Sequence, residues 1–272
     1  MRIITIEPNK TVKHLWQELW QYRELFFFLA WRDMVVRYKQ TVIGVAWSVI
    51  RPLLTTVVFT VVFGRLAHLP SGNTPYLLLV YAGMLPWQFF SGTLTESGGS
   101  IVANANVVTK VYFPRIIIPT ASIVVSLVDF MISFVILLGL MCWYNFWPDW
   151  KILAVPFLLI LATMTSLGIG YWVAALNVKY RDFRYIVPFI VQFGLYISPV
   201  GISSAIVPEK WRFFYSMNPM VGVIDGFRWA LLGKNISLYA PGFIMSVILA
   251  ALLFLSGVWF FMKTERKFAD VI

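Results

Sequence analysis

The residues of this chain that could do acid–base or metal chemistry are few and lie far apart. Only 12 Asp and Glu occur in 272 residues, and the two in or near apolar stretches, Glu96 and Asp129, belong to different predicted helices. General acid–base catalysis needs such groups within hydrogen-bond reach of one reacting centre. The histidines, His14 and His68, fall on opposite sides of the predicted membrane, and Cys142 is the single cysteine. The pattern therefore predicts no catalytic site and no metal site.

A phosphate-binding loop of the form G-x-x-x-x-G-K-[ST] does not occur in the sequence. Gly233-Lys234 is followed by Asn235 and lacks the preceding glycine. The chain is therefore not expected to cradle ATP phosphates by this loop or to bind a cofactor of its own. Any ATP-driven process in which the chain takes part would therefore need another polypeptide to bind the nucleotide through such a loop.

Composition predicts a membrane protein. The chain is 60% hydrophobic and 12% charged, with a mean hydropathy of +0.78, whereas soluble domains are about 45–50% apolar and about 25% charged. We predict an all-α polytopic membrane protein with six transmembrane helices, an N-terminal amphipathic interface helix and a short re-entrant helix pair before the last span. Because a span needs about 20 apolar residues, the six are expected at about 43–66, 76–98, 119–144, 152–176, 186–202 and 242–262.

Basic residues set the expected orientation. Fifteen of the 22 Lys and Arg residues fall on one side of the six predicted spans, and such cations are enriched in cytoplasmic segments. We therefore expect a cytoplasmic N-terminal segment 1–42, a six-span domain 43–262 and a cytoplasmic tail 263–272. The formal charge of +10 is then explained by topology and anionic lipid, and no nucleic-acid partner is expected.

Two segments outside the predicted spans do not look like ordinary loops: one precedes the first span and the other precedes the last. Residues 11–28 have helical apolar spacing and paired tryptophans beside cations, which predicts a helix in the headgroup plane; packing on the cytoplasmic ends of the spans is the alternative. Residues 203–241 form two pieces too short to span and too apolar for a solvated loop. They are expected to dip into the outer leaflet as two short helices, or to lie flat on it as a hairpin. Candidate gate residues in this segment are Pro208, Trp211, Asn218, Pro219 and Arg228.

Arg51 lies about two turns inside the first predicted span. A cation near mid-membrane costs about 2.5–3.5 kcal/mol on insertion scales, so it should face protein or water. One interpretation places it in a conduit, where a phosphate could pair with it. The alternative is a structural partner such as Glu96 or Asp129, or snorkelling toward the interface.

An aromatic stripe runs along the fifth predicted span. Tyr185, Phe189, Phe193 and Tyr196 recur at intervals of four, four and three residues, with Gln192 close to the same face. Aromatic rings can stack on the apolar faces of sugars while offering few strong donors, which would let a polymer slide. Helix packing or lipid contact is the alternative.

A series of ordered motifs extends from about residue 20 to the C-terminus. They include Arg37-Tyr38-Lys39-Gln40-Thr41, Gly44, Trp47, Arg51-Pro52, Ala82-Gly83-Met84-Leu85-Pro86-Trp87, Lys110-Val-Tyr112-Phe113-Pro114-Arg115, Ser198-Pro199 and Asn218-Pro219. This series resembles the membrane subunit of type-2 ABC exporters. Within that group it is similar to the polysaccharide branch, the Wzm-type permeases that export O-antigen, capsule and teichoic-acid chains.

The resemblance implies a homodimer around a central conduit in the bacterial inner membrane, with both termini cytoplasmic. It also implies two ATP-binding cassette subunits on a separate chain, which hold ATP and Mg, and a polyprenyl-linked polysaccharide as cargo. The chain itself is then a non-catalytic transporter subunit. Trp47 joins Arg51 and the aromatic stripe as a candidate conduit residue.

The cytoplasmic stretch 103–115 is long enough for a short helix. The resemblance implies that it docks the ATPase; an ordinary connecting loop is the alternative. Its candidate docking residues are Asn104, Asn106, Lys110, Tyr112 and Arg115.

Other functions remain open at this point. A type-2 ABC exporter of another lipid or drug would have the same architecture. A membrane enzyme acting on polyprenyl-linked sugars would need clustered carboxylates or histidines, which the sequence does not provide. A passive channel would work without an ATPase.

Overall fold

The computed structural model describes residues 20–39, 44–70, 74–180, 182–233, 236, 238–265 and 268, and every regular element in these ranges is helical. The elements in chain order are α2 (Arg23–Lys39), α3 (Gly44–Phe59), the π-helix η1 (Thr60–Leu66), α4 (Tyr76–Ala103), α5 (Ala105–Lys110), α6 (Ile117–Ala121), α7 (Ile123–Trp143), the 3-10 helix η2 (Trp150–Ala154), α8 (Val155–Lys179), α9 (Phe183–Ile197), the 3-10 helix η3 (Ser204–Ile206), α10 (Glu209–Tyr215), α11 (Pro219–Leu232) and α12 (Ala240–Glu265).

Five helical segments are long and apolar enough to cross a membrane, and each overlaps one of the predicted spans. They are Ala46–Leu66, Tyr76–Ala103, Ile117–Trp143, Trp150–Lys179 and Ala240–Glu265. The remaining prediction, 186–202, corresponds to α9, which has 15 residues and ends at Ile197. Such a helix is about 22 Å long, shorter than the hydrocarbon core of about 30 Å. It ends there because Pro199 disfavours helical backbone at the residue before it, and Ser198 is extended.

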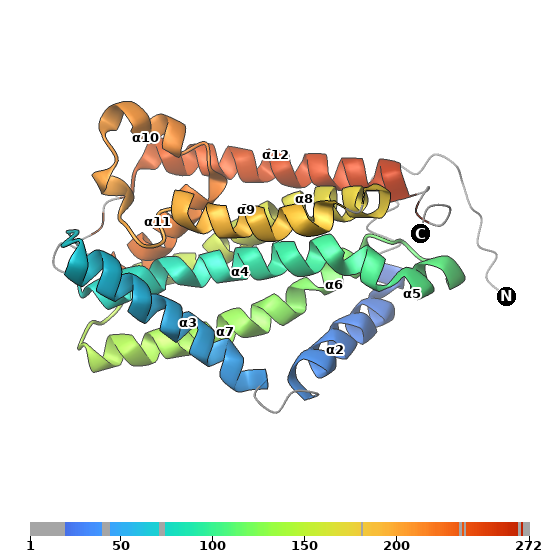
Figure 1. The fold of residues 1–272 in the computed structure, drawn as a ribbon, viewed down its shortest axis with the longest axis horizontal. Coiled ribbons are helices and arrows are strands. Elements are labelled where there is room, and N and C mark those ends of the chain that lie inside the picture. The colour runs from blue at the N-terminus through green and yellow to red at the C-terminus, as the bar shows by residue number, and fades with distance from the viewer. Residues whose placement is uncertain are drawn as a thin grey trace.

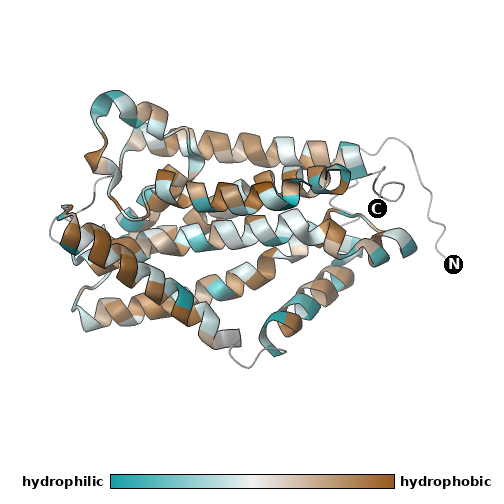
Figure 2. Cartoon of the chain, viewed as in Figure 1, coloured by the Kyte–Doolittle hydropathy of each residue, from teal (hydrophilic) through white to brown (hydrophobic). Residues whose placement is uncertain are grey.

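The long helices form a bundle with two distinct ends (Figure 1). At one end lie α10 and the start of α12; at the other lie α5 and the last turns of α8 and α12. We call these the α10 end and the α5 end. Hydrophobic residues dominate α3, α7 and α12, whereas hydrophilic residues gather at the two ends and on α2 (Figure 2). This distribution is typical of helices that present their sides to lipid and their ends to water.

α4 is the centre of the bundle. It packs against α3, α7, α8, α9 and α11, and 78% of its most apolar window is buried, compared with 17% for the windows in the first and last spans. α8 and α12 approach so closely that a Cβ on Gly168 would lie 2.6 Å from the backbone of Leu253. Small residues at helix contacts allow this approach, and close packing is what holds helices together in lipid.

The N-terminal helix extends further than the predicted segment 11–28. Residues 11–19 lie outside the described part of the chain, and α2 continues to Lys39. Neither proline nor glycine interrupts residues 23–39, so nothing ends the helix at 28. Leu29 and Ala30 are buried in a hydrophobic cluster that also includes residues of α6, α8 and α12. The exposed aromatic side chains of this region are Trp20, Phe27, Phe28 and Trp31.

Candidate functional site

The aromatic stripe of α9 points out of the bundle. Tyr185, Phe189, Phe193 and Tyr196 are each at least 53% exposed, and Gln192 among them is exposed as well. The rings of Phe189 and Phe193 lie 4.4 Å apart. The stripe is therefore not part of the internal packing of the chain.

The opposite face of α9 holds the helix against α4. Val187 is buried beside Gly98, and Gly194 lies so close to Trp87 that an added Cβ would be 2.6 Å from its ring. Positions 187 and 194 are two helical turns apart and share one face. The aromatic stripe is consequently turned away from α4.

The candidate conduit residues of α3, Trp47 and Arg51, are exposed too. Arg51 makes no ion pair in the described part of the chain; the carboxylates considered as its structural partners are bound by Arg37 instead. Toward the α10 end, the ring of Phe59 stacks 6.4 Å from that of Tyr196. α3 and α9 therefore meet at one end and carry their exposed side chains on neighbouring surfaces.

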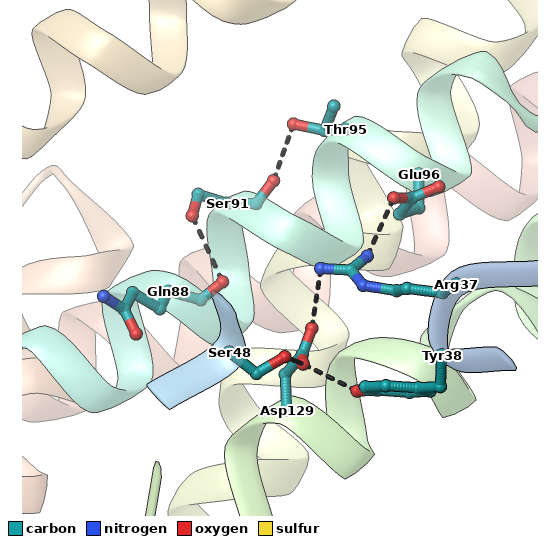
Figure 3. A network of polar contacts seen from close by, with 8 residues as sticks. All are labelled: Arg37, Tyr38, Ser48, Gln88, Ser91, Thr95, Glu96 and Asp129. Carbon is teal, nitrogen blue, oxygen red and sulfur yellow. Dashed lines mark hydrogen bonds and ion pairs between the residues drawn. The ribbon is translucent and has the colours of Figure 1, made fainter. Parts of the chain in front are cut away.

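A polar network connects four helices near the start of α3 (Figure 3). Arg37 of α2 donates to Glu96 of α4 at 3.0 Å and pairs with Asp129 of α7 at 2.7 Å. Asp129 also accepts from the Tyr38 hydroxyl at 2.7 Å and from the Ser48 hydroxyl of α3 at 2.6 Å. The two carboxylates that the sequence analysis separated thus share one guanidinium. Because Asp129 is fully engaged in holding helices, the network is an ion-pair cluster and not an acid–base pair.

Between positions 88 and 99, the side of α4 that is not buried carries only polar residues and glycines. The sequence alone had not been interpreted in this way. The residues of this side that are not buried between positions 88 and 99 are Gln88, Ser91, Gly92, Thr95, Glu96 and Gly99. Ser91 donates to the carbonyl of Gln88, and Thr95 to that of Ser91 (Figure 3). Hydrocarbon offers such a surface no partners, so it must face water, cargo or protein. The alternation of three- and four-residue steps between polar or glycine positions was the available signal.

Three of the candidate docking residues are exposed at the α5 end. Asn106 and Lys110 belong to α5, and Tyr112 follows it with 55% of its surface exposed. α5 has six residues and packs against α4, with Val108 buried. Asn106 and Lys110 are therefore exposed on the outer side of this short helix.

The other two candidate docking residues make bonds within the chain. The Asn104 amide donates to the carbonyl of Ser100 at 2.8 Å. The Arg115 guanidinium donates to the carbonyl of Glu265 in the last turn of α12. A cation at a helix C-terminus compensates the free carbonyls there, so Arg115 holds the segment after α5 to α12.

At the α10 end, the turn at Ser198-Pro199 and the turn at Asn218-Pro219 are connected by a hydrogen bond. Asn218 caps α11 by accepting from the Met220 N–H at 3.0 Å, and its amide donates to the Ser198 hydroxyl at 2.9 Å. Pro219 occupies the first helical position, where its missing N–H costs nothing. The turn after α9 is thereby attached to the start of α11.

The remaining candidate gate residues differ in exposure. Pro208 precedes α10, and Trp211 on α10 is 62% exposed. α11, by contrast, is mostly buried among α4, α8 and α12. Arg228 is 1% exposed; burial lowers the pKa of its guanidinium to about 10, which leaves it charged at neutral pH. Burial raises the pKa of the nearby Asp225 carboxyl, and Arg228 and a Ser204 hydrogen bond oppose that rise.

Comparison with known proteins gives a family match. The family model described as "ABC-2 type transporter" matches residues 24–232. The chain is 28% identical to the "O-antigen export system permease protein RfbA" of Myxococcus xanthus, over 94% of this chain and 98% of that protein. It is 26% identical to the RfbA protein of the same description from Klebsiella pneumoniae, over 92% and 95% of the two chains. It is 25% identical to the "Capsule polysaccharide export inner-membrane protein CtrC" of Neisseria meningitidis, over 83% and 86%.

Replacing Asp129 with Ala tests the four-helix network. The hydroxyls of Tyr38 and Ser48 lose their shared acceptor, and Arg37 loses one carboxylate while it keeps that of Glu96. We expect a loss of roughly 1–3 kcal/mol in the free energy of unfolding, toward the lower end because the site is partly solvated. Asp129→Asn, which keeps one acceptor oxygen, should lose less. Thermal unfolding of the purified protein in detergent measures both.

Ser91→Ala is the matched control, because the Ser91 hydroxyl bonds only to its own helix. If Asp129→Ala melts at the same temperature as Ser91→Ala, the network does not hold the helices together.

Proposed function

Because this chain belongs to the ABC-2 type transporter family, we propose that it is the permease subunit of an ATP-driven exporter that moves a lipid-linked polysaccharide across the bacterial cytoplasmic membrane. The similarity to permeases named for O-antigen export, over more than nine-tenths of the chain, is the observation that carries this function. Other relatives are named for capsule polysaccharide and polysialic acid. All of these cargoes are long glycans, which favours a polysaccharide over a drug or a simple lipid.

The energy for export is supplied by a separate protein. The chain has no phosphate-binding loop, so ATP and Mg are held by two ATP-binding cassette subunits on another polypeptide. These subunits dock at the α5 end, where Asn106, Lys110 and Tyr112 are exposed. The α5 end and both termini are then cytoplasmic, in agreement with the excess of cations expected there.

Two copies of the chain form the conduit. Arg51 and Gln192 are exposed on helices that are mostly apolar, and a charged or amide group facing hydrocarbon is costly. A homodimer that brings α3, α4 and α9 of each copy toward a shared aqueous path removes this cost. Trp47 and the aromatic stripe then line the path, and the polar side of α4 contributes hydroxyl and amide groups.

The ends of the bundle contact the membrane surfaces. The exposed aromatic side chains of α2 are suited to the cytoplasmic headgroup layer, where aromatic rings and nearby cations are favoured. α10 and α11 form the short re-entrant pair at the outer side, in which the buried α11 is shielded by protein, as backbone at that depth requires. Pro208, Trp211, Asn218 and Pro219 are then at the outer mouth of the conduit.

Reversing the charge of Lys110 tests the docking surface. Lys110→Glu should reduce co-purification of the partner ATPase roughly tenfold, which corresponds to about 1.4 kcal/mol, because an exposed cation at the interface is replaced by an anion. Lys179→Glu is the matched control, since Lys179 is an exposed cation at the same end of the bundle. Pull-down of the ATPase from membranes with equal permease content measures the effect. Equal recovery with both variants would contradict docking through α5.

Phe193 tests whether the aromatic stripe touches the glycan. If the rings provide faces for sugars, Phe193→Tyr should export nearly normally and Phe193→Leu should export several-fold more slowly at the same protein level. Stacking of a base on an aromatic ring contributes about 1–3 kcal/mol, which is an upper guide because a sugar has no π-face. Surface polysaccharide, measured at matched membrane abundance, gives the comparison.

Phe157→Leu supplies the control for aromatic removal as such. Phe157 lies on α8 and is 54% exposed, close to the 53% of Phe193. Equal export by Phe193→Leu and Phe157→Leu would mean that the stripe contacts lipid or packs against protein.

A further inference from the structure

The turn that follows α9, residues 198–202, is held by donors from two other helices. The Val200 and Ile202 carbonyls accept from the two terminal nitrogens of Arg228 at 2.7 and 2.8 Å. The Gly201 carbonyl between them accepts from the Tyr76 hydroxyl at 2.7 Å. Three successive carbonyls of a largely buried, non-helical turn are therefore satisfied by side chains from α11 and α4. Unpaired carbonyls in such surroundings would be costly.

Arg228 joins the same turn to the middle of the bundle. Its Nε donates to the carbonyl of Leu79 in α4 at 3.0 Å. One turn further along α4, Gly83 leaves the space that the guanidinium fills, because a Cβ there would lie 2.7 Å from Nη2. All three nitrogens of this planar fork are used, which fixes its position in a way that a lysine amine could not.

In the described part of the chain, no comparable set of side-chain hydrogen bonds holds the other end of α9. Among the described residues of its first half, Phe183 to Val191, no side chain makes a hydrogen bond or ion pair with another element. Packing contacts hold that side: Val187 lies beside Gly98 of α4, the Phe183 ring lies 6.4 Å from that of Tyr180, and α9 also packs against α8. Because α9 runs from the α5 end to the α10 end (Figure 1), its tightly held end is the one farthest from α5.

We propose that Arg228 is a positioning residue for export, which fixes the α10 end of α9 as a pivot while the opposite end moves with the ATPase. A few residues at the end of an element commonly absorb such a motion. The pivot keeps the last turn of the aromatic stripe at a constant distance from α4 and lets its first turn change position. This inference rests on the proposed function, which gives α9 its place beside the path of the glycan.

The test begins with Gly83→Ala, which displaces the guanidinium while keeping Arg228 itself. Gly139→Ala on α7 is the matched control, because an added Cβ there meets nothing within 4 Å and the residue lies outside the proposed path. Arg228→Lys keeps the charge and cannot reach three carbonyls, and Tyr76→Phe removes one bond to the same turn. At matched membrane abundance, Gly83→Ala and Arg228→Lys should lower polysaccharide export several-fold, Tyr76→Phe should lower it less, and Gly139→Ala should leave it unchanged.

A distance measurement separates positioning from mere folding. Spin labels at Ile197 and Ile244 report the α10 end, and labels at Ile186 and Trp259 report the α5 end; all four positions are exposed. The exposed Cys142 is first replaced by Ser, and labelled chains are diluted with unlabelled ones in the complex with the ATPase. ATP should change the Ile186–Trp259 distance and leave Ile197–Ile244 unchanged. In Gly83→Ala the Ile197–Ile244 distribution should broaden even without ATP.

Normal export and unchanged distances in Gly83→Ala and Arg228→Lys would overturn the proposal. Reduced export with parental distances in both pairs would overturn it as well, because Arg228 would then not act through the position of α9. If Gly83→Ala does not accumulate, Arg228→Lys and Tyr76→Phe give the same comparison. Failure of the unsubstituted chain to export any polysaccharide with its ATPase would instead contradict the proposed function, and the distances would still test the pivot.

Discussion

A guanidinium that is 1% exposed must find its partners inside the protein, and Arg228 finds them in three backbone carbonyls of α4 and of the turn after α9. The arrangement of the α10 end depends on this interaction. A non-helical turn buried among apolar helices needs donors that its own backbone cannot supply. Arg228 provides them only because Gly83 leaves room for it. Removing either group leaves buried polar atoms unpaired, which costs more than the bond itself contributes.

Polar groups also find their partners inside the protein near the start of α3, where Asp129 is the shared acceptor. There the carboxylate collects Arg37, Tyr38 and Ser48, and so attaches the two N-terminal helices to α4 and α7. The buried centre of the molecule, α4 with α8 and α11, is held mainly by close packing. The helices that carry the exposed conduit candidates, α3 and α9, lie outside this centre and have polar anchors near one end. Such an arrangement allows the outer helices to shift while the centre stays packed.

The sequence predicted the elements whose signals are local. Apolar runs of sufficient length predicted five helices that the structure contains and that are long enough to span a membrane. Ser198-Pro199 explains why α9 ends before its predicted boundary. Contacts between distant residues could not be read in this way. Arg37 reaches carboxylates 59 and 92 positions later in the chain, and periodicity carries no information on that pairing. The sequence suggested that Arg51 would need a structural partner such as Glu96 or Asp129. In the structure Arg51 is exposed, and Arg37 binds these carboxylates.

The candidate sites were predictable to different degrees. The exposed face of α9 follows from the spacing of Tyr185, Phe189 and Phe193, since one helical face repeats at three and four residues. The docking segment depended on the family resemblance, and sequence alone could not distinguish Lys110, which is exposed, from Arg115, which is bonded to α12. The difference arises because the last turn of α12 lies beside Arg115, although Glu265 is 150 positions later in the chain.

The most direct test of the central claim is transport by purified components. The chain is reconstituted in lipid vesicles with its partner ATPase, and a lipid-linked polysaccharide is supplied on the side where the ATPase is exposed. The account predicts that glycan becomes accessible to a glycan-binding lectin on the opposite side only when both proteins and hydrolysable ATP are present. Glycan that crosses equally well without the ATPase, or with a non-hydrolysable nucleotide, would contradict an ATP-driven permease.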